Sequence, residues 1–514
     1  MTENAPNILL FMVDQLTAFV LSAYGGTECR TPHLDQLAAQ STVFDQAYCA
    51  YPLCLPSRYA LMTGRLPSRI GAFDNGAELP AATPTFTHYL RRAGYYTCLS
   101  GKMHFVGPDQ LHGFEDRLTT EIYPADMSWT PTPAFGGNTT QENGGPEAGV
   151  STIDTVKDAG PVARSMQIDY DEEVIHQATR ALYQRKRGND KRPFFMTVSL
   201  TQPHDPYVTT QTYWDRHRAS DIGPPRVPHI PVEARDPHSQ SLYYHYSQDK
   251  CQLDDADFRN ARRGYYGMIA QIDDHLGRVL QVVRDCGYAD NTAVLFTSDH
   301  GDMIGERGMW FKKTLYEPAI HVPLMIRLPN QSPGRVSRPV SLLDVFPTLL
   351  DIADIQDERP TDQRDGASLL PDTVGKGADR PVLIEHIDGG TEAPRVCLRK
   401  GQWKLVASRA YPPMLFDLQA DPLEVQNVVD QHPDITAKLM DQVEAAWPMD
   451  TLLETVQSAQ AARKLVDNAL SQGRETRWDH TPTLPQPYVR RGDGFPDVER
   501  RGYIKSATSG SRKA

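Results

Sequence analysis

The 514-residue sequence lacks the run of roughly 18 consecutive apolar residues that a transmembrane helix needs, so we expect no such helix. Cysteine is scarce: seven residues, an odd number, indicate reduced thiols rather than a disulfide framework. Residues 1–6 lack the basic and apolar segments of a secretory signal. Together these absences predict a cytoplasmic protein.

Positive charge is also in deficit. The chain has 53 Lys and Arg against 65 Asp and Glu, a formal net charge of −12. A net acidic chain has no overall attraction to nucleic acid or to an anionic membrane, so we expect neither partner. Its length allows about two to four domains with a large buried core.

What the sequence does contain is one repeated pattern, a short apolar run that ends in ionisable residues. The four runs are residues 7–13, 95–99, 194–200 and 292–298. The residues that follow them include Asp14, Lys102, His104, His204, Asp299 and His300. Continuous apolar runs suit strands buried on both faces, as in a parallel sheet between two layers of helices. Because ligands bind at the carboxyl ends of such strands, the four ends predict one shared site.

Helices are expected between these strands, over 32–40, 84–93 and 253–286. The last of these repeats apolar residues at the spacing of one buried helix face. Two stretches, 123–163 and 201–241, have no such period and are rich in Pro with Gly, Thr or His. Loops of this length in a compact domain are usually lids or binding loops.

After residue 380 the pattern changes to short strands with tight turns, followed by a helix from about residue 433 to residue 470. We expect a small antiparallel sheet covered by this helix. The tail from residue 471 is polar and Arg-rich, yet it keeps several aromatic residues and should pack on something. The predicted architecture is therefore an α/β domain over 1–380, an α+β subdomain over 381–470 and a tail over 471–514.

The most specific local signal is Cys54-Leu55-Pro56-Ser57-Arg58. A helix is expected from about Pro56 to Gly64. A cysteine at a helix N-terminus has a lowered pKa and lies where anions bind. Arg58, one turn later, can face the same anion. A lone cysteine in such a place is more often an ordinary thiol, so the spacing of the neighbours matters.

That spacing is C-x-P-S-R, which a formylglycine-generating enzyme reads in type I sulfatases. With the strand-end residues, the chain resembles the sulfatase branch of the alkaline phosphatase superfamily over roughly residues 5 to 430. The resemblance implies a mixed, mostly parallel sheet sandwiched by helices. It also implies conversion of Cys54 to formylglycine by that enzyme, with the hydrate of formylglycine as the nucleophile.

The resemblance further implies one divalent cation held by Asp14, Asp299, His300 and the modified Cys54. An Asp at a strand end can also be a simple helix cap, which is the alternative for Asp14. Gln15 stands where many arylsulfatases have a second Asp, and His300 where many have Asn. Calcium prefers oxygen ligands and manganese tolerates imidazole better, so both ions stay open.

Four further residues match family motifs for cations around the sulfate. They are Lys102 and His104 in G-K-x-H, His204 in x-P-H-x-P, and Lys312 after the second metal motif. The divalent cation, Arg58, Lys102 and Lys312 would neutralise the charge of the sulfate. In the implied mechanism His204, beside Lys312, protonates the leaving alcohol, and His104 deprotonates the hydrate so that sulfate is expelled.

Within the sulfatases, residues 100–131 and the tail from Trp478 resemble choline-sulfatases. A quaternary ammonium group wants an aromatic face and a carboxylate, for which Trp129, Tyr123 and Glu385 are candidates. Ordinary packing is the alternative for each of the three. The implied substrate is a small sulfate ester, choline sulfate or similar, and the tail implies a homodimer or homotetramer.

The segments after Trp129 and after Arg490 depart from the choline-sulfatase pattern, so the alcohol stays open. The alternatives are an arylsulfatase, a phosphonate monoester or phosphodiester hydrolase, and a silent binding protein of the same fold.

Overall fold

The computed structural model describes residues 5–131, 151–357, 364–387 and 389–472. The chain divides into two units, residues 1–469 and 470–514. The first unit holds the sheets and helices below, and only residues 470–472 of the second are described. In the described part of the chain, no helix combines the length and the apolar character that a membrane span requires.

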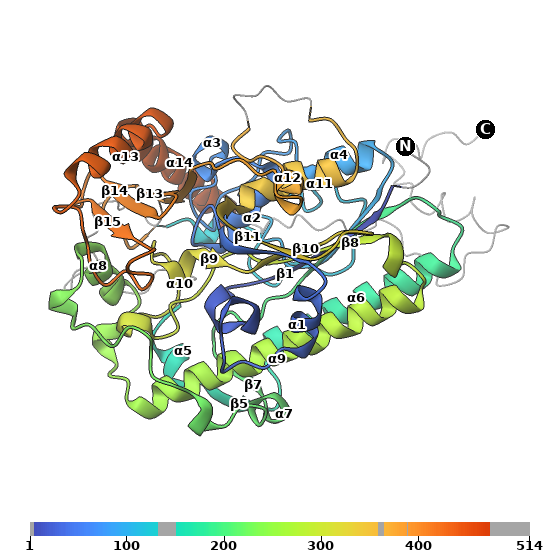
Figure 1. Ribbon diagram of the computed structural model, residues 1–514, viewed down its shortest axis with the longest axis horizontal. Coiled ribbons are helices and arrows are strands. Elements are labelled where there is room, and N and C mark those ends of the chain that lie inside the picture. Colours follow the sequence, from blue (N-terminus) through green and yellow to red (C-terminus); the bar gives the residue numbers. More distant parts are fainter. Residues whose placement is uncertain (1–4, 132–150, 358–363, 388, 473–514) are drawn as a thin grey trace, which may run out of the picture. The chain divides into compact units, whose positions relative to one another are not determined.

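A mixed, mostly parallel sheet forms the centre of the first unit (Figure 1). Its strand order is β11-β2-β10-β8-β1-β6-β3-β4, and β9 pairs with β2. The strands are β1 Asn7–Val13, β2 Thr42–Tyr48, β3 Tyr96–Gly101, β4 Asp116–Arg117, β6 Phe194–Ser199, β8 Thr292–Ser298, β9 His321–Val322, β10 Leu324–Arg327 and β11 Gly334–Ser341. Strand β1 is parallel to β6 and β8, and β3 is parallel to β6, so the four predicted strands are adjacent.

Helices cover both faces of this sheet. Alternate residues of β1 enter two different cores, with Leu9 and Phe11 in one and Ile8 and Leu10 in the other. The first core contains α6 and α9, and Figure 1 shows α4 and α11 on the opposite side. The main helices are α1 Pro32–Ala38, α2 Cys54–Thr63, α4 Phe86–Arg92, α6 Met166–Arg187, α9 Asp255–Asp285 and α11 Val345–Ile352. The predicted sandwich is confirmed.

Shorter elements fill the connections between these layers. The helices are α3 Pro67–Ile70, α5 Asp154–Lys157, α7 Gln211–Trp214, α8 Pro237–His245, α10 Glu317–Ile320 and α12 Leu370–Thr373. Strands β5 Gly160–Val162 and β7 Val208–Thr210 pair in parallel. The described parts of the two predicted long loops thus contain several short helices and strands.

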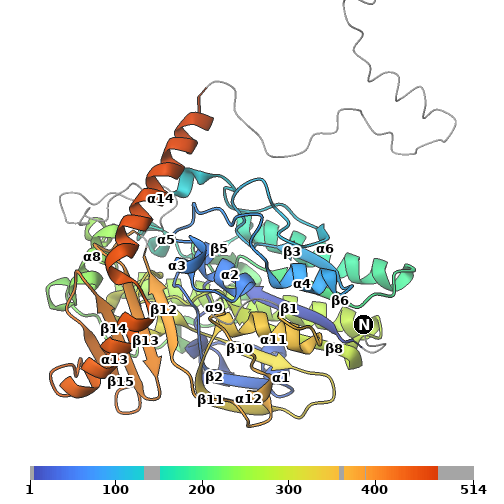
Figure 2. The same ribbon diagram turned by 90° about the horizontal axis from the view of Figure 1, so that it is seen from above.

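A second, antiparallel sheet follows in the order β12-β13-β14-β15 (Figure 2). Its strands are β12 Val382–His386, β13 Arg395–Lys400, β14 Trp403–Ser408 and β15 Met414–Asp417. Leu398 and Leu405 of this sheet share one core with Leu439 and Val443 of α13 Pro433–Ala446. The predicted antiparallel sheet is confirmed, while the boundary at residue 380 stays a prediction.

Two predicted helices differ from the structure. The expected helix over 433–470 is two helices, α13 and α14 Met449–Leu470, because Pro448 disfavours a helical conformation at Trp447. The helix expected over 84–93 begins at Phe86, because Thr85 forms a capping box with His88.

Candidate active site

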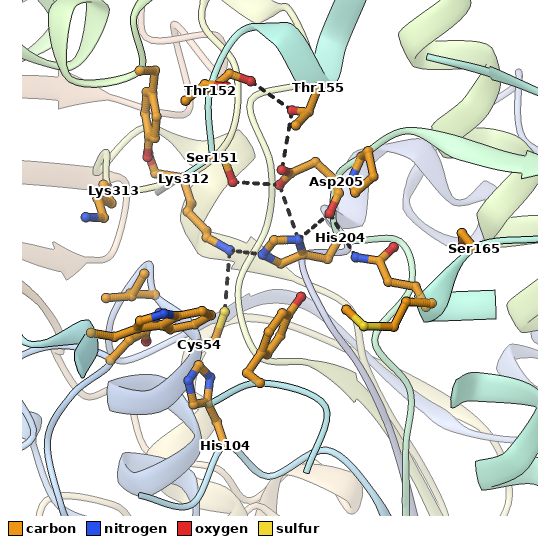
Figure 3. Close-up of a pocket in the computed structure, with 18 of the residues that line it drawn as sticks. Cys54, His104, Ser151, Thr152, Thr155, Ser165, His204, Asp205, Lys312 and Lys313 are labelled. Carbon is orange, nitrogen blue, oxygen red and sulfur yellow. Dashed lines mark hydrogen bonds and ion pairs between the residues drawn. The ribbon is translucent and has the colours of Figure 1, made fainter. Parts of the chain in front are cut away.

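Two of the predicted strand-end residues, His104 and His204, line one cavity together with Cys54 (Figure 3). The cavity has a volume of about 410 Å³. Its lining includes Cys54, His104, Tyr123, Trp129, His204 and Lys312. They come from the ends of β3 and β6, from the start of α2 and from loops between the elements. The site therefore forms only when distant parts of the chain fold together.

A buried group of candidate metal ligands adjoins this cavity. Ligand atoms of Asp14, Cys54, Asp299 and His300 all lie within 4.8 Å of one another. Cys54 Sγ is 3.6 Å from Asp14 Oδ1 and 3.3 Å from His300 Nε2. Two carboxylates, one imidazole and one more donor can coordinate a divalent cation. The donor set therefore fits the ion that the sequence resemblance implied.

Positive side chains set the electrostatics of this group. Burial would raise the pKa of the Cys54 thiol, but Lys102, Lys312 and His300 hold it well below its usual value. Burial also acts to raise the pKa of Asp14, and Lys102 with other nearby cations outweighs it and lowers that pKa. The position of Cys54 thus stabilises negative charge, as a nucleophile or a bound anion requires.

Helix α2 places Cys54 and Arg58 one turn apart. Leu53 is an extended N-cap, and Gly64 ends the helix with φ 63°, in the left-handed region that glycine tolerates. The structure starts the helix at Cys54, two residues before the predicted start at Pro56. A proline in the first turn costs no helical hydrogen bond, so Pro56 does not interrupt it.

Arg58 is fully buried and joins three strand ends. Its Nε donates to Asp299 Oδ2 at 2.8 Å, and its Nη1 donates to Lys102 O at 2.7 Å and Ser199 Oγ at 2.9 Å. Its Nη2 is 3.9 Å from Asp14 Oδ2 and has no hydrogen-bond partner among the described residues. These contacts make Arg58 a counterion to the ligand carboxylates as well as a candidate anion-binding group.

His104 faces Cys54 with its ring and is anchored by its backbone (Figure 3). His104 has a backbone φ of 62°, and its backbone N–H donates to Glu121 Oε2 at 2.8 Å. Both ring nitrogens are buried without a hydrogen-bond partner in the described chain, and burial lowers the pKa of the ring. A neutral imidazole of this kind can accept a proton.

His204 and Lys312 share a close contact on the opposite wall. Lys312 Nζ lies 2.7 Å from His204 Nε2 and 3.4 Å from Cys54 Sγ. Both nitrogens cannot donate at once, so this contact holds one exchangeable proton. His204 Nδ1 lies 2.7 Å from the backbone oxygen of Asp205 and 3.2 Å from its Oδ1, and these contacts orient the ring. The pair is arranged to deliver a proton to a group bound beside Cys54.

Four residues that were not among the predicted site residues support the site. Gln15 accepts from Lys312 Nζ at 2.6 Å and donates to Asp302 Oδ2 at 2.6 Å. Asp171 accepts from the backbone of Thr201 at 2.8 Å and so fixes the loop that carries His204. Asn75 accepts from Leu55 N at 3.1 Å and lines the cavity, and Asp205 orients His204. Gln15 and Asp205 directly follow motif residues, which is a usable signal, whereas Asn75 and Asp171 carry none.

Tyr123 and Trp129 form an aromatic wall beside His104. The ring centroid of His104 lies 5.5 Å from that of Tyr123 and 5.5 Å from that of Trp129. The centroids of Tyr123 and Trp129 are 5.3 Å apart. Lys102 Nζ is 4.2 Å from the Tyr123 centroid. Both aromatic residues line the cavity, as a substrate-binding role requires.

Glu385, the third predicted substrate contact, does not line this cavity. It is fully buried, and its carboxylate accepts from Ser68 N at 2.8 Å and Trp447 Nε1 at 2.6 Å. Because these donors occupy both carboxylate oxygens of Glu385, its contacts do not support a role in binding substrate.

The two long loops both reach the cavity. Ser151 and Thr155 of the first and Pro206 of the second are among its lining residues. Residues 132–150 lie outside the described residues, as does the tail from residue 473 with its predicted interface.

Comparison with known proteins finds two matching family profiles and several similar relatives. A family profile described as Sulfatase matches residues 6–355, and one described as N-sulphoglucosamine sulphohydrolase, C-terminal, matches 305–447. Choline-sulfatase from Rhizobium meliloti (strain 1021) is 42% identical and covers 94% of each chain. Arylsulfatase K from Bos taurus is 28% identical over 85% of this chain and 80% of its own.

Solved structures show the same fold. The phosphonate monoester hydrolase of Agrobacterium radiobacter matches with a TM-score of 0.70 at 24% identity, over 86% of this chain and 95% of its own.

Proposed function

This chain belongs to the sulfatase family and is a sulfatase, and we propose that it hydrolyses a small organic sulfate monoester, choline sulfate or a similar compound. Membership confirms the resemblance that the C-x-P-S-R motif indicated. The observation that carries the proposal is the buried ligand group of Asp14, Cys54, Asp299 and His300, with Lys102 and Lys312 beside it.

We propose that a formylglycine-generating enzyme converts Cys54 to formylglycine, whose hydrate supplies the nucleophilic oxygen. The C-x-P-S-R sequence supports this, as does the position of Cys54 Sγ, 3.3 Å from His300 Nε2 and 3.4 Å from Lys312 Nζ. An unmodified thiol or a serine has no second hydroxyl to expel the sulfate, so the modification is needed for repeated turnover.

Asp14, Asp299, His300 and an oxygen on the modified residue would hold one divalent cation, calcium or manganese. Such an ion lowers the pKa of a nucleophilic oxygen and neutralises charge on the ester. Oxygen ligands favour calcium, and the imidazole of His300 is more compatible with manganese.

The remaining steps belong to side chains around the cavity. Lys102 and Lys312 would contact the non-bridging oxygens of the sulfate and stabilise their charge. His204 would transfer a proton from Nε2 to the oxygen of the leaving alcohol. His104, whose ring nitrogens have no partner among the described residues, would accept a proton as sulfate departs.

The choline part of the proposal rests on two supports. One is the 42% identity with the choline-sulfatase, and the other is the aromatic wall of Tyr123 and Trp129. Aromatic faces attract quaternary ammonium groups. The alternative substrate is an aryl sulfate, or a phosphonate monoester or phosphodiester. The similarity to the arylsulfatase relatives and to the phosphonate monoester hydrolase is the reason to test these esters.

An activity panel tests the proposal. Purified enzyme is assayed with choline sulfate, 4-nitrophenyl sulfate and an aryl phosphonate, while mass spectrometry examines the peptide that contains Cys54. We expect a formylglycine mass and the highest kcat/KM for choline sulfate. A higher kcat/KM for an aryl ester would identify that ester, rather than choline sulfate, as the preferred substrate. An active enzyme with unmodified Cys54 would overturn the mechanism.

We also propose a homodimer or homotetramer, in which the tail from about Trp478 packs against a neighbouring subunit. The resemblance of the tail sequence to choline-sulfatases and its aromatic residues support this proposal.

A further inference from the structure

A second cavity, of about 270 Å³, lies between the loop over 230–239, the loop over 307–316 and the antiparallel sheet. Its lining includes Arg235, Asp236, Arg307, Arg395, Tyr411 and Glu424. Among the described residues, none of these six lines the Cys54 cavity. The volume is slightly below the range of sites for drug-sized ligands, so it suits a ligand of few atoms.

Two arginines of this cavity keep unused donors. Arg235 is 7% exposed; its Nε donates to Ile230 O at 2.9 Å and its Nη2 to Gly308 O at 3.2 Å. Its Nη1 is buried without a partner in the described chain. Arg395 is 2% exposed, and its Nε likewise has no partner there. Buried donors are nearly always paired, so these two need an acceptor.

The carboxylates of the cavity are already engaged. Asp236 accepts from Ser239 N at 3.1 Å and Tyr316 Oη at 3.1 Å. Glu424 pairs with Lys404 Nζ at 2.6 Å and accepts from Glu317 N at 2.8 Å. Neither forms an ion pair with Arg235 or Arg395 among the pairs of described residues.

The groups behind Arg395 add no negative charge. Its Nη1 contacts His238 Nδ1, and the His238 ring lies 5.2 Å from that of His386. Burial holds the pKa of both imidazoles well below its usual value, so both are neutral. Asp236 attracts both guanidinium groups without forming a salt bridge to either among the described residues, and burial still lowers the pKa of both arginines. An anionic ligand would offset this cost of burial.

We propose that this second cavity binds a small oxyanion, such as inorganic sulfate or phosphate, through Arg235 Nη1 and Arg395 Nε. Guanidinium groups only donate, which selects an anion over a metal ion, and their planar donors suit an oxyanion. The loop over 307–316 lines this cavity and also carries Lys312. The inference rests on the second cavity alone and does not depend on the identity of the substrate.

Crystals of the full-length protein soaked in sodium selenate test the site directly, because selenium scatters anomalously. We expect one anomalous peak within hydrogen-bond distance of Arg235 Nη1 and Arg395 Nε, separate from any peak beside Cys54. Water alone in the second cavity at saturating selenate would overturn the proposal. This measurement needs no variant and so does not depend on the folding of a mutant.

Calorimetric titration with sodium selenate, sodium phosphate and sodium acetate then measures affinity in solution and separates tetrahedral oxyanions from carboxylates. Arg235→Met should weaken binding at the second site by about tenfold or more, since a charged hydrogen bond is lost. Arg335→Met is the matched control, because Arg335 is 55% exposed and pairs with Asp45 on the surface.

Turnover of 4-nitrophenyl sulfate by Arg235→Met should stay near the wild-type value, which also shows that the variant folds. Equal selenate affinity in the two variants would mean that the crystal peak reports an adventitious ion only. Stronger binding of acetate than of selenate would contradict the proposed ligand class.

Discussion

The chemistry of Cys54 depends on its surroundings and on what replaces its sulfur. Cys54→Ser keeps a similar volume beside His300 and Lys312, so we expect a melting temperature near that of the wild type. It cannot form a hydrate with two hydroxyls, so steady turnover should fall by several orders of magnitude. Steady-state kinetics and a thermal melt measure both effects.

Cys286→Ser is the matched control for Cys54→Ser. Cys286 is also buried, but it contacts Leu182 O at 3.8 Å away from the site, so turnover should persist. Near-normal activity of Cys54→Ser would rule out the formylglycine mechanism.

The two carboxylates at the strand ends should control metal content. Asp14→Asn and Asp299→Asn each remove a charged ligand, so we expect bound metal and activity to fall together. Asp299→Asn would also remove the nearer counterion of Arg58, at 2.8 Å, and leave Asp14 at 3.9 Å. A fully unpaired buried charge costs about 3–5 kcal/mol in unfolding free energy, so the loss of stability should stay below that value. Elemental analysis of the purified variants measures the bound metal. Full metal occupancy in both variants would show that the metal binds elsewhere.

Asp205 should act through His204 rather than on the substrate itself. Its Oδ1 lies 3.2 Å from His204 Nδ1, and its negative charge favours the protonated ring. Asp205→Asn keeps the backbone acceptor but removes this charge, so it should lower the protonated fraction of the proton donor. Protonation matters most when the leaving group is basic. We therefore expect kcat/KM for an alkyl sulfate to fall by about 10² while 4-nitrophenyl sulfate is affected much less.

Asp215→Asn, on the same segment but 61% exposed, is the control for Asp205→Asn. An equal loss on both esters would show that Asp205 has only a structural role.

At the scale of elements, the sequence predicted strands better than helix ends. The four apolar runs are continuous because those strands are buried on both faces, and this alone placed the residues after them together. The predicted start of α4 at residue 84 was wrong, because Thr85, one residue inside that range, forms the capping box.

Long-range contacts explain what sequence reasoning missed in the site. Glu385 lies one residue before the end of β12, yet Ser68 and Trp447, which donate hydrogen bonds to it, are 317 and 62 residues away along the chain. Asp171 lies on α6 and supports a loop thirty residues later, at Thr201. No local pattern reveals such partners before the chain is folded.

Glu385 links β12 to α3 and to the junction of α13 and α14, and its titration should appear in stability. Burial raises the pKa of Glu385 to about 7 from an ordinary value of 4.5. The folded state therefore binds a proton more tightly, a stabilisation present below the unfolded-state pKa and lost as the pH rises to about 7.

Glu385→Gln removes the titrating group, but its NH2 must face one of the two N–H donors that the carboxylate accepts from. We expect the variant to be less stable than the wild type near pH 4.5, and the difference in unfolding free energy to change in its favour by up to about 3 kcal/mol above pH 7. Denaturant unfolding across this range measures the difference, with Glu444→Gln, 48% exposed, as the control. An unchanged pH profile would contradict the raised pKa, and unchanged kcat/KM would agree with its place outside the cavity.

At the scale of the whole molecule, the tail provides the test of assembly. Truncation after residue 472 should reduce the number of subunits in the assembly, because the proposal places the tail in the interface between subunits. KM should rise for the true substrate while a small activated aryl ester is affected less. Light scattering and paired kinetics measure both, and a truncated chain unchanged in mass and kinetics would refute the proposed role.

The burial of Cys54 also orders events in time. In the folded chain Cys54 is 2% exposed, in the first turn of α2 and close to groups from β1 and β8. Under the proposed modification, the modifying enzyme has to reach a side chain that the folded chain buries, so it would act before those strands assemble. The active fraction would then depend on the rate of modification relative to the rate of folding, and a molecule that folds first would keep an unmodified thiol. Slower synthesis or more modifying enzyme should raise the active fraction without changing the amount of folded chain.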